Sequence, residues 1–120
     1  MSFIPTRDAF DHIGLITDRP QADETWVEPN RLWVTNPRDH PFHVEYLRYA
    51  PDSPAPHVLQ ARPHVAYRTT DMASALAGRR VIQPPFDPSG VGFVKVAFIE
   101  IGDALIELME YRDPNETGWF

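Results

Sequence analysis

Two histidines occupy matching places in two similar apolar runs of the sequence. FDHIGLITD at 10–18 and PHVAYRTTD at 63–71 each contain a histidine, alternating apolar positions and a closing Thr-Asp. Each half of the chain also ends in a strand-like run with a glutamate, HVEYLRY at 43–49 and LIELMEY at 105–111. Imidazoles and carboxylates bind divalent metals and also transfer protons. The recurrence predicts that His12 and His64 belong to one site and are not two unrelated packing residues.

The glutamate of the last run, Glu107, is predicted to lie in covered surroundings. Successive residues of a strand face opposite sides, so Glu107 shares a face with Leu105 and Met109, while Ile106 and Leu108 face the other way. Both faces are therefore largely apolar. Because a buried carboxylate is costly unless it is paired or binds a cation, a metal ion would relieve this cost.

Prolines divide the chain into two unequal halves. The segment PDSPAPHVLQARP at 51–63 is predicted to be an extended connector, because proline fixes φ and lacks a donor. We expect a single domain over residues 1–120, with a first module at about 8–50, a connector at 51–62 and a second module at about 63–112.

The two modules differ in helix content. In the second module a short helix is expected over MASALAGRR, because this segment follows Asp71, a good N-cap. Strands are expected after it at 81–83, 93–101 and 104–111. In the first module, strands are expected around Trp26–Val27, at 31–34 and at 43–49, with no helical segment after Asp18. The first half is therefore predicted to be a strand, a short turn and three strands, and the second half a strand, a helix and three strands.

The bulk composition excludes several classes of protein. The hydrophobic content of 42% and charged content of 23% are ordinary for a globular protein. A formal net charge of −6 argues against a nucleic-acid partner. No apolar run approaches membrane-spanning length, so we expect no membrane association and a cytoplasmic location. The absence of cysteine removes disulfides and thiolate chemistry.

With these runs in place, the chain resembles the vicinal oxygen chelate superfamily, which includes glyoxalases, methylmalonyl-CoA epimerases and bleomycin-resistance proteins. The resemblance is carried by DHIG at 11–14, HVAYRTTDM at 64–72 and VAFIEIGDALIELMEY at 96–111. In its metalloenzymes two βαβββ modules form a cupped sheet around one divalent ion. The first strand of each module supplies a histidine and the last strand a glutamate or glutamine. The resemblance implies an α+β fold of two βαβββ-like modules, the first lacking most of its helix, that form one cupped mixed β-sheet. The resemblance therefore implies a metal site whose ligands are His12, Glu45, His64 and Glu107.

Such a ligand set suits Zn²⁺, Ni²⁺, Co²⁺ or Mn²⁺. The function that the resemblance implies is a metal-dependent lyase or isomerase of the glyoxalase or epimerase type, acting on a small α-oxygenated substrate through a metal-chelated enediolate. Glu107 is the first choice for the catalytic acid–base group, with Glu45 as its partner on the opposite side.

Two other functions of the same superfamily remain open. A non-catalytic, antibiotic-sequestering binding protein would hold a flat ligand in the cup without a metal. It predicts that Glu45 and Glu107 are replaceable, whereas Trp26 and Trp33 are not. A ring-cleaving dioxygenase would need ferrous iron held by two histidines and one glutamate.

Further residues could contact a substrate or replace a ligand. Arg68 is expected on the face of His64 and is the best candidate for a substrate contact. Trp26 and Trp33 are expected to pack the core of the first half, or to line a ligand cavity or a dimer contact. His43 could replace Glu45 as a ligand, because both should share a strand face. With few helices to cover the sheet, a homodimer is expected.

Overall fold

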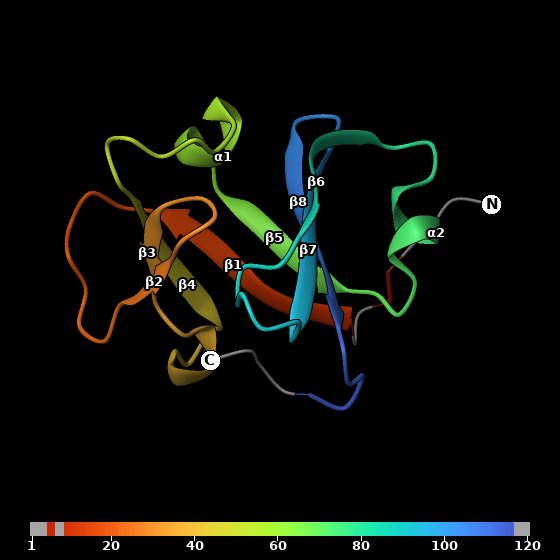
Figure 1. Cartoon of the computed structure of the whole chain (residues 1–120), viewed down its shortest axis with the longest axis horizontal. Coiled ribbons are helices and arrows are strands. Elements are labelled where there is room, and N and C mark those ends of the chain that lie inside the picture. Colours follow the sequence, from red (N-terminus) through yellow and green to blue (C-terminus); the bar gives the residue numbers. More distant parts are fainter. Residues whose placement is uncertain (1–4, 7–8, 117–120) are drawn as a thin grey trace.

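The computed structural model describes residues 5–6 and 9–116, and its main element is one mixed β-sheet. Eight strands lie in the order β2-β3-β4-β1-β5-β8-β7-β6 and curl around an inner face (Figure 1). The prediction of a cupped mixed sheet in an α+β protein is confirmed. Residue 8, where the first module is predicted to begin, lies outside the described residues. The strands are β1 (Phe10–Ile16), β2 (Thr25–Val27), β3 (Leu32–Val34), β4 (Val44–Tyr49), β5 (His64–Arg68), β6 (Arg80–Phe86), β7 (Val94–Ile101) and β8 (Ala104–Tyr111).

The two halves of the chain contribute four strands each and use the same pairing. In the first half β1 pairs with β4 in parallel, and in the second half β5 pairs with β8 in parallel. The first strands of the halves, β1 and β5, pair antiparallel and join the halves at the centre of the sheet (Figure 1). The four central strands β4, β1, β5 and β8 are therefore those that open and close each half.

Helices are few and short. The helix α2 (Met72–Leu76) begins as predicted, because the Asp71 carboxylate accepts a hydrogen bond of 3.1 Å from the backbone N–H of Ser74. It is shorter than the predicted segment and is followed by Gly78, whose φ of 71° lies in the left-handed region that glycine tolerates. Between β1 and β2 the described residues contain no α-helix, as expected.

The connector differs from its prediction, because it contains the helix α1 (His57–Ala61). Its prolines precede the helix or follow it, so they do not interrupt its hydrogen bonds. Leu59 of α1 is buried against Phe98 and Leu105, and this packing stabilises the short helix. His57, which lies in the segment predicted to be an extended connector, is thus the first residue of α1.

The boundaries of the second-half strands agree closely with expectation, except at β6. β8 matches the predicted range and β7 begins one residue later. β6 runs on through Pro84 and Pro85 to Phe86. It can do so because it is the edge strand of the sheet, where a missing N–H donor is tolerated.

In the second half of the chain, apolar side chains are buried on both the inner and the outer face of the sheet. In the first half they are buried mainly on the inner face. The helix α2 covers the outer face of β7 and β8, where Met72 and Ala75 contact Ala97, Ile99 and Leu108. The first half buries its apolar residues on the inner face instead. They are Val27, Leu32, Val34 and Leu47.

Trp26 and Trp33 do not belong to that core, so the core prediction for them is wrong. Strand alternation sends Val27 and Val34 inward and both tryptophans outward. There the indole rings lie 4.7 Å apart, with the Arg48 guanidinium 4.0 Å from the Trp33 ring centre and Arg31 over Trp26. They form an aromatic patch on the outer face of β2 and β3.

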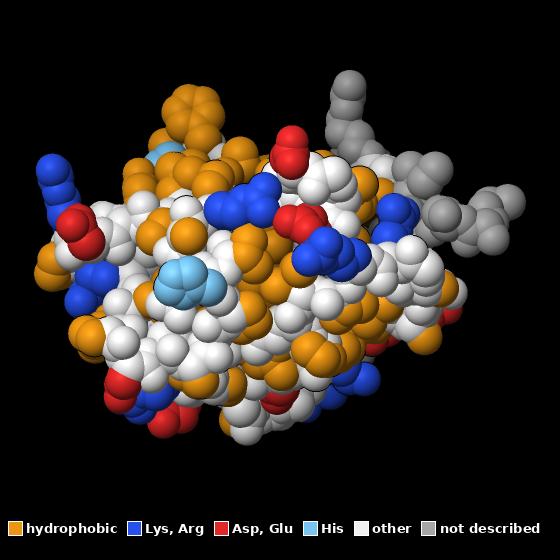
Figure 2. Space-filling view, turned by 90° about the horizontal axis from the view of Figure 1, so that it is seen from above, with side chains coloured by type: hydrophobic (Ala, Val, Ile, Leu, Met, Phe, Trp, Pro, Cys, Tyr) orange, Lys and Arg blue, Asp and Glu red, His pale blue; other side chains and the backbone are white. Residues whose placement is uncertain are grey.

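The surface carries charges of both signs. Figure 2 shows acidic and basic side chains interspersed with hydrophobic ones on one face of the molecule. Several arginines are engaged in ion pairs with nearby carboxylates, such as Arg48 with Glu24 and Arg62 with Glu100. No helix in the described part of the chain is long and apolar enough to cross a membrane.

Candidate metal centre

Four titratable side chains from the four central strands meet inside the curl of the sheet. They are His12 of β1, Glu45 of β4, His64 of β5 and Glu107 of β8. All four are buried, and none retains more than 8% of its surface exposed. The repeated histidine and glutamate of the two halves thus come together in one place, as the recurrence predicts.

The pairing of the strands explains how they meet. Glu45 lies beside Gly14, which is two residues after His12 in the neighbouring strand. In the second half, Glu107 lies beside Ala66, again two residues after the histidine of that half. Because side chains two residues apart share a face, each histidine and its glutamate point into the same space.

The antiparallel pairing of β1 and β5 then brings the two pairs together. His12 lies opposite Ala66, and His64 lies opposite Gly14, so each imidazole faces a small residue of the other strand. The fit at Gly14 is close: a Cβ atom there would lie 2.6 Å from Nδ1 of His64 and nearer still to other ring atoms. Glycine at this position therefore makes room for the His64 ring.

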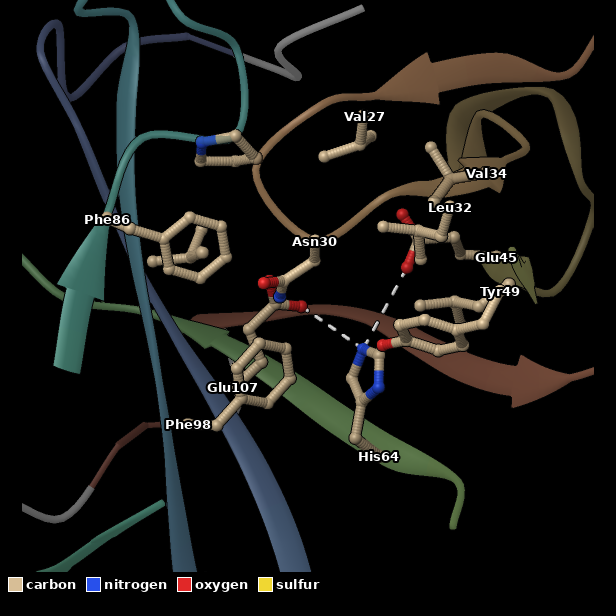
Figure 3. Close-up of a pocket in the computed structure, with 13 residues that line it drawn as sticks. Val27, Asn30, Leu32, Val34, Glu45, Tyr49, His64, Phe86, Phe98 and Glu107 are labelled. Atoms are coloured by element: carbon tan, nitrogen blue, oxygen red, sulfur yellow. Dashed lines mark ion pairs between the residues drawn. The ribbon is translucent and has the colours of Figure 1, made fainter. Parts of the chain in front are cut away.

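The distances among the four side chains suit one metal ion. Nε2 of His12 and Nε2 of His64 are 3.4 Å apart, and Oε1 of Glu107 lies 3.1 Å from each of them. Oε1 of Glu45 is 3.3 Å from Nε2 of His12 and 3.8 Å from Nε2 of His64. Figure 3 shows His64 between the two glutamates, with both ion pairs marked. Ligands held about 2.0–2.2 Å from a tetrahedral ion lie roughly 3.3–3.6 Å from one another. The donor set therefore fits a divalent ion, whose charge two carboxylates would balance.

Asp11 fixes the orientation of His12. Its Oδ1 lies 2.6 Å from Nδ1 of His12, and its Oδ2 accepts hydrogen bonds from Arg38 at 2.7 Å and from Nε of Arg68 at 2.9 Å. A histidine that donates Nδ1–H to a carboxylate presents the lone pair of Nε2 on the other side of the ring. Here that nitrogen faces Glu45 and Glu107.

No family model matches the chain, and no curated protein matches it significantly. The assignment of the site therefore rests on the chemistry of its own residues.

A small cavity gives access to the cluster. It offers about 40 Å³ to the centres of water-sized molecules, where one water needs on the order of 10–15 Å³. Three of the ligands, Glu45, His64 and Glu107, line it, and Asn30 and Tyr49 lie beside them (Figure 3). The rest of the lining is apolar and comes from both halves of the chain.

Three residues predicted to contact a substrate lie elsewhere. Arg68 is bound to Asp11 and to the backbone oxygen of Glu116, and its guanidinium stacks on the Tyr111 ring 4.6 Å away. Trp26 and Trp33 line a separate surface depression. Of the described residues, these three are not among those that line the cavity beside the ligands.

His43 does not replace Glu45. It precedes β4 with a positive φ of 56°, which breaks the strand alternation that would give both residues the same face. Its Nδ1 lies 3.3 Å from the backbone oxygen of Asp11, and its side chain is exposed. Glu45 itself is buried in the cluster, whereas the neighbouring Arg48 pairs with Glu24.

Sequence reasoning missed Asp11, Tyr49 and Asn30. A signal for Tyr49 was present, since it lies four residues after Glu45 and so shares its strand face. Asp11 gave a weaker signal, because strand alternation places it on the face opposite His12. An irregularity in the β1–β5 pairing between Phe10 and His12 accompanies its contact with the imidazole.

Two groups of the cluster, Glu107 and His12, have strongly shifted pKa values. Burial alone would raise the pKa of Glu107, but hydrogen bonds from His12 and His64 lower it to about 2. Burial alone would lower the pKa of His12, but the Glu45 charge and the hydrogen bond to Asp11 raise it well above its ordinary value. Without a metal ion, the cluster therefore holds a proton on His12, and a bound ion would take its place.

This proton gives the metal-free protein a characteristic pH dependence. A histidine whose pKa is raised by folding stabilises the fold fully below its unfolded pKa of 6.5, and this contribution is lost as the pH rises through the folded pKa. We expect the free energy of unfolding in the presence of chelator to fall as the pH rises above 6.5, as measured by urea denaturation. In the His12→Gln variant the fall should be clearly smaller, and an equal fall in both proteins would contradict the assignment.

Proposed function

We propose that the protein is a divalent-metal-dependent lyase or isomerase of the glyoxalase or epimerase type that acts on a small α-oxygenated substrate. The observation that carries this proposal is the buried group of two imidazole nitrogens and two carboxylates at the spacing of a metal's ligands, open to a cavity on one side. A carboxylate beside a cavity can serve as the general base that proton abstraction next to a carbonyl requires.

We also propose that each half is a βαβββ-like module, the first truncated, and that the chain belongs with the vicinal oxygen chelate proteins. Two observations support this. The parallel pairing of first and last strand is repeated in both halves, and each half places its glutamate beside the residue two positions after its histidine. Only the second half has a helix between its first two strands in the described residues.

His12, Glu45, His64 and Glu107 would hold the metal ion. When bound, the ion supplies positive charge that stabilises the enediolate formed as the substrate loses a proton. The residues of the chain would bind and orient the ion. The two histidines anchor the centre, and Asp11 keeps His12 in the tautomer that presents Nε2 to it.

In this proposal Glu107 moves the proton. Its carboxylate lines the cavity, so a substrate bound there would offer a C–H bond to it. Glu107 takes the proton from the substrate carbon, the electron pair moves to the adjacent oxygen, and a carboxylic acid returns a proton to the neighbouring carbon. The Tyr49 hydroxyl, which has no hydrogen-bond partner in the described part of the chain, would donate to a substrate oxygen.

Deuterium exchange tests this step without knowledge of the final product. Metal-loaded protein is incubated in D₂O with a panel of α-hydroxy ketones and hemithioacetals, and loss of the α-proton is followed by NMR. We expect exchange with at least one compound, and the Glu107→Gln variant should be about 100-fold slower or more. Glu110→Gln is the matched control, because Glu110 lies on the same strand but on the other face. Equal exchange rates for wild type and Glu107→Gln would contradict the proposal.

The alternative, a metal-free binding protein of the bleomycin-resistance type, has less support. It needs the tryptophans at the ligand, but Trp26 and Trp33 lie on the outer face of β2 and β3. It also leaves two buried carboxylates without a role, although burying charge is costly.

A further inference from the structure

We propose that the site selects an uncharged substrate: a short molecule with two adjacent oxygens at the metal end, a compact apolar body and no second acidic group. This inference rests on the proposed function and adds its substrate class. It excludes carboxylate, phosphate and other anionic tails of the kind that extended cofactor-like substrates carry.

The charges of the cavity support this selection. The only charged groups among its described lining residues are the carboxylates of Glu45 and Glu107, beside the imidazole of His64, and no lysine or arginine lines it. One divalent ion balances two carboxylates. A second anionic group on the substrate would therefore have no counter-charge among the described lining residues.

The arginines that could have supplied such a counter-charge form ion pairs with carboxylates outside the cavity. Arg68 lies on the strand of His64 but donates to Asp11, and Arg38 donates to the same carboxylate. Moving Arg68 toward a substrate would leave the buried Asp11 with one cation fewer, which is costly. Arg62 is held by Glu100 and the backbone oxygen of Asp103.

The remaining wall of the cavity is suited to an apolar body. Its side chains come from both halves and include Val27, Leu32, Val34, Phe86, Val96 and Phe98 (Figure 3). An unpaired carboxylate placed against such a wall loses its hydration without compensation. A methyl group of similar size gains from the same contact.

The polar groups at the wall are neutral. The Asn30 and Gln83 amides bond to each other in both directions at 3.0 Å and join the β2–β3 turn to β6 across the cavity. This pairing leaves Asn30 one further N–H and one lone pair, which suits a neutral hydroxyl or carbonyl. The small volume of the cavity, about 40 Å³, limits the substrate body to a few carbon atoms unless the wall moves.

Two hydroxamic acids of nearly equal size test the proposal directly. Butyrohydroxamic acid and succinic acid monohydroxamate share the two adjacent oxygens, and they differ in that a carboxylate replaces a methyl group at the far end. Binding to nickel-loaded protein is measured by calorimetry at pH 7.5 and 150 mM salt. We expect the neutral compound to bind at least ~30-fold more tightly, which corresponds to about 2 kcal/mol. Binding of the two compounds to aqueous Ni²⁺ gives the intrinsic preference to subtract.

A variant makes the test independent of the intrinsic chemistry of the two compounds. Pro88 lies at the cavity in the loop after β6, so Pro88→Arg adds a cation there without touching the metal ligands. We expect this variant to lose most of the discrimination between the two compounds, whatever its absolute affinity for butyrohydroxamic acid. Equal or tighter binding of the anionic compound by the wild-type protein would overturn the proposal.

Failure of the metal site can be distinguished from failure of the selection rule. If titration with Ni²⁺ alone shows no binding, the proposed function fails, and the selection is then tested on metal-free protein with 1-butanol and butyrate. Chemical-shift changes at Val34 and Phe98 with the alcohol but not with the anion would support an apolar, anion-rejecting cavity. Shifts with butyrate at equal or lower concentration would overturn it.

Discussion

Gly14→Ala is expected to reduce metal affinity at least 100-fold while the chain still folds. A Cβ atom at this position would lie 2.6 Å from Nδ1 of His64, well inside van der Waals contact. The imidazole cannot simply turn aside, because it is buried and packs edge-on against Phe98 with ring centres 5.3 Å apart. The added methyl group therefore displaces one of four ligands. Altering residues that only orient a ligand costs 10–100-fold, so losing the ligand itself should exceed that range.

Competitive titration against a chromophoric chelator measures this effect, and circular dichroism checks the fold. Overpacking of this kind also costs about 1–3 kcal/mol of stability. The matched control is the same substitution in a His64→Ala background, where the ring is absent. There Gly14→Ala should cause little further loss of affinity. Wild-type affinity in the single variant would show that His64 does not bind the ion in this position.

Asp11→Asn is expected to lower metal affinity by about 10–100-fold. The amide keeps the shape of the side chain, and its oxygen can still accept from Nδ1 of His12. It removes the negative charge that makes this imidazole a stronger ligand, and it leaves Arg38 and Arg68 facing a neutral group. Because both guanidinium groups are partly exposed, we expect a moderate loss of stability, about 1–3 kcal/mol.

The same competitive titration tests Asp11, with urea denaturation in parallel. Asp18→Asn is the control, because Asp18 ends the same run but is exposed. A structural role alone would lower stability and leave the affinity of the folded protein unchanged. An unchanged affinity in Asp11→Asn would therefore contradict the assignment of Asp11 as the residue that positions His12.

Strand periodicity and the recurrence of a histidine near the start and a glutamate near the end of each half predict the strands and one shared site for the two histidines. The resemblance to the vicinal oxygen chelate superfamily adds the cupped sheet and the full ligand set of His12, Glu45, His64 and Glu107. Periodicity and recurrence are local in sequence, and the pairing of the strands follows from the repeat. The Asp71 N-cap is local too, and it also agrees with the structure.

Features that depend on neighbours distant in sequence could not be predicted. The alternation of side chains along a strand predicts Arg68 on the face of His64. Its partner Asp11, however, comes from another strand, at an irregular point of the β1–β5 pairing. Core positions are predicted for Trp26 and Trp33, whereas the alternation of β2 and β3 gives the inner positions to smaller residues such as Val27. The helix α1 forms because Leu59 finds a buried position, which proline content alone does not reveal.

The measurement that tests the central claim most directly is the metal content of protein purified without chelators, compared with a His64→Ala/Glu107→Gln variant prepared in parallel. We predict close to one divalent ion per chain in the wild-type protein and almost none in the variant, with both proteins folded. Metal in neither protein, together with no binding when Zn²⁺, Ni²⁺, Co²⁺ and Mn²⁺ are added, would contradict the account. His12 would then be a packing residue beside an apolar cavity.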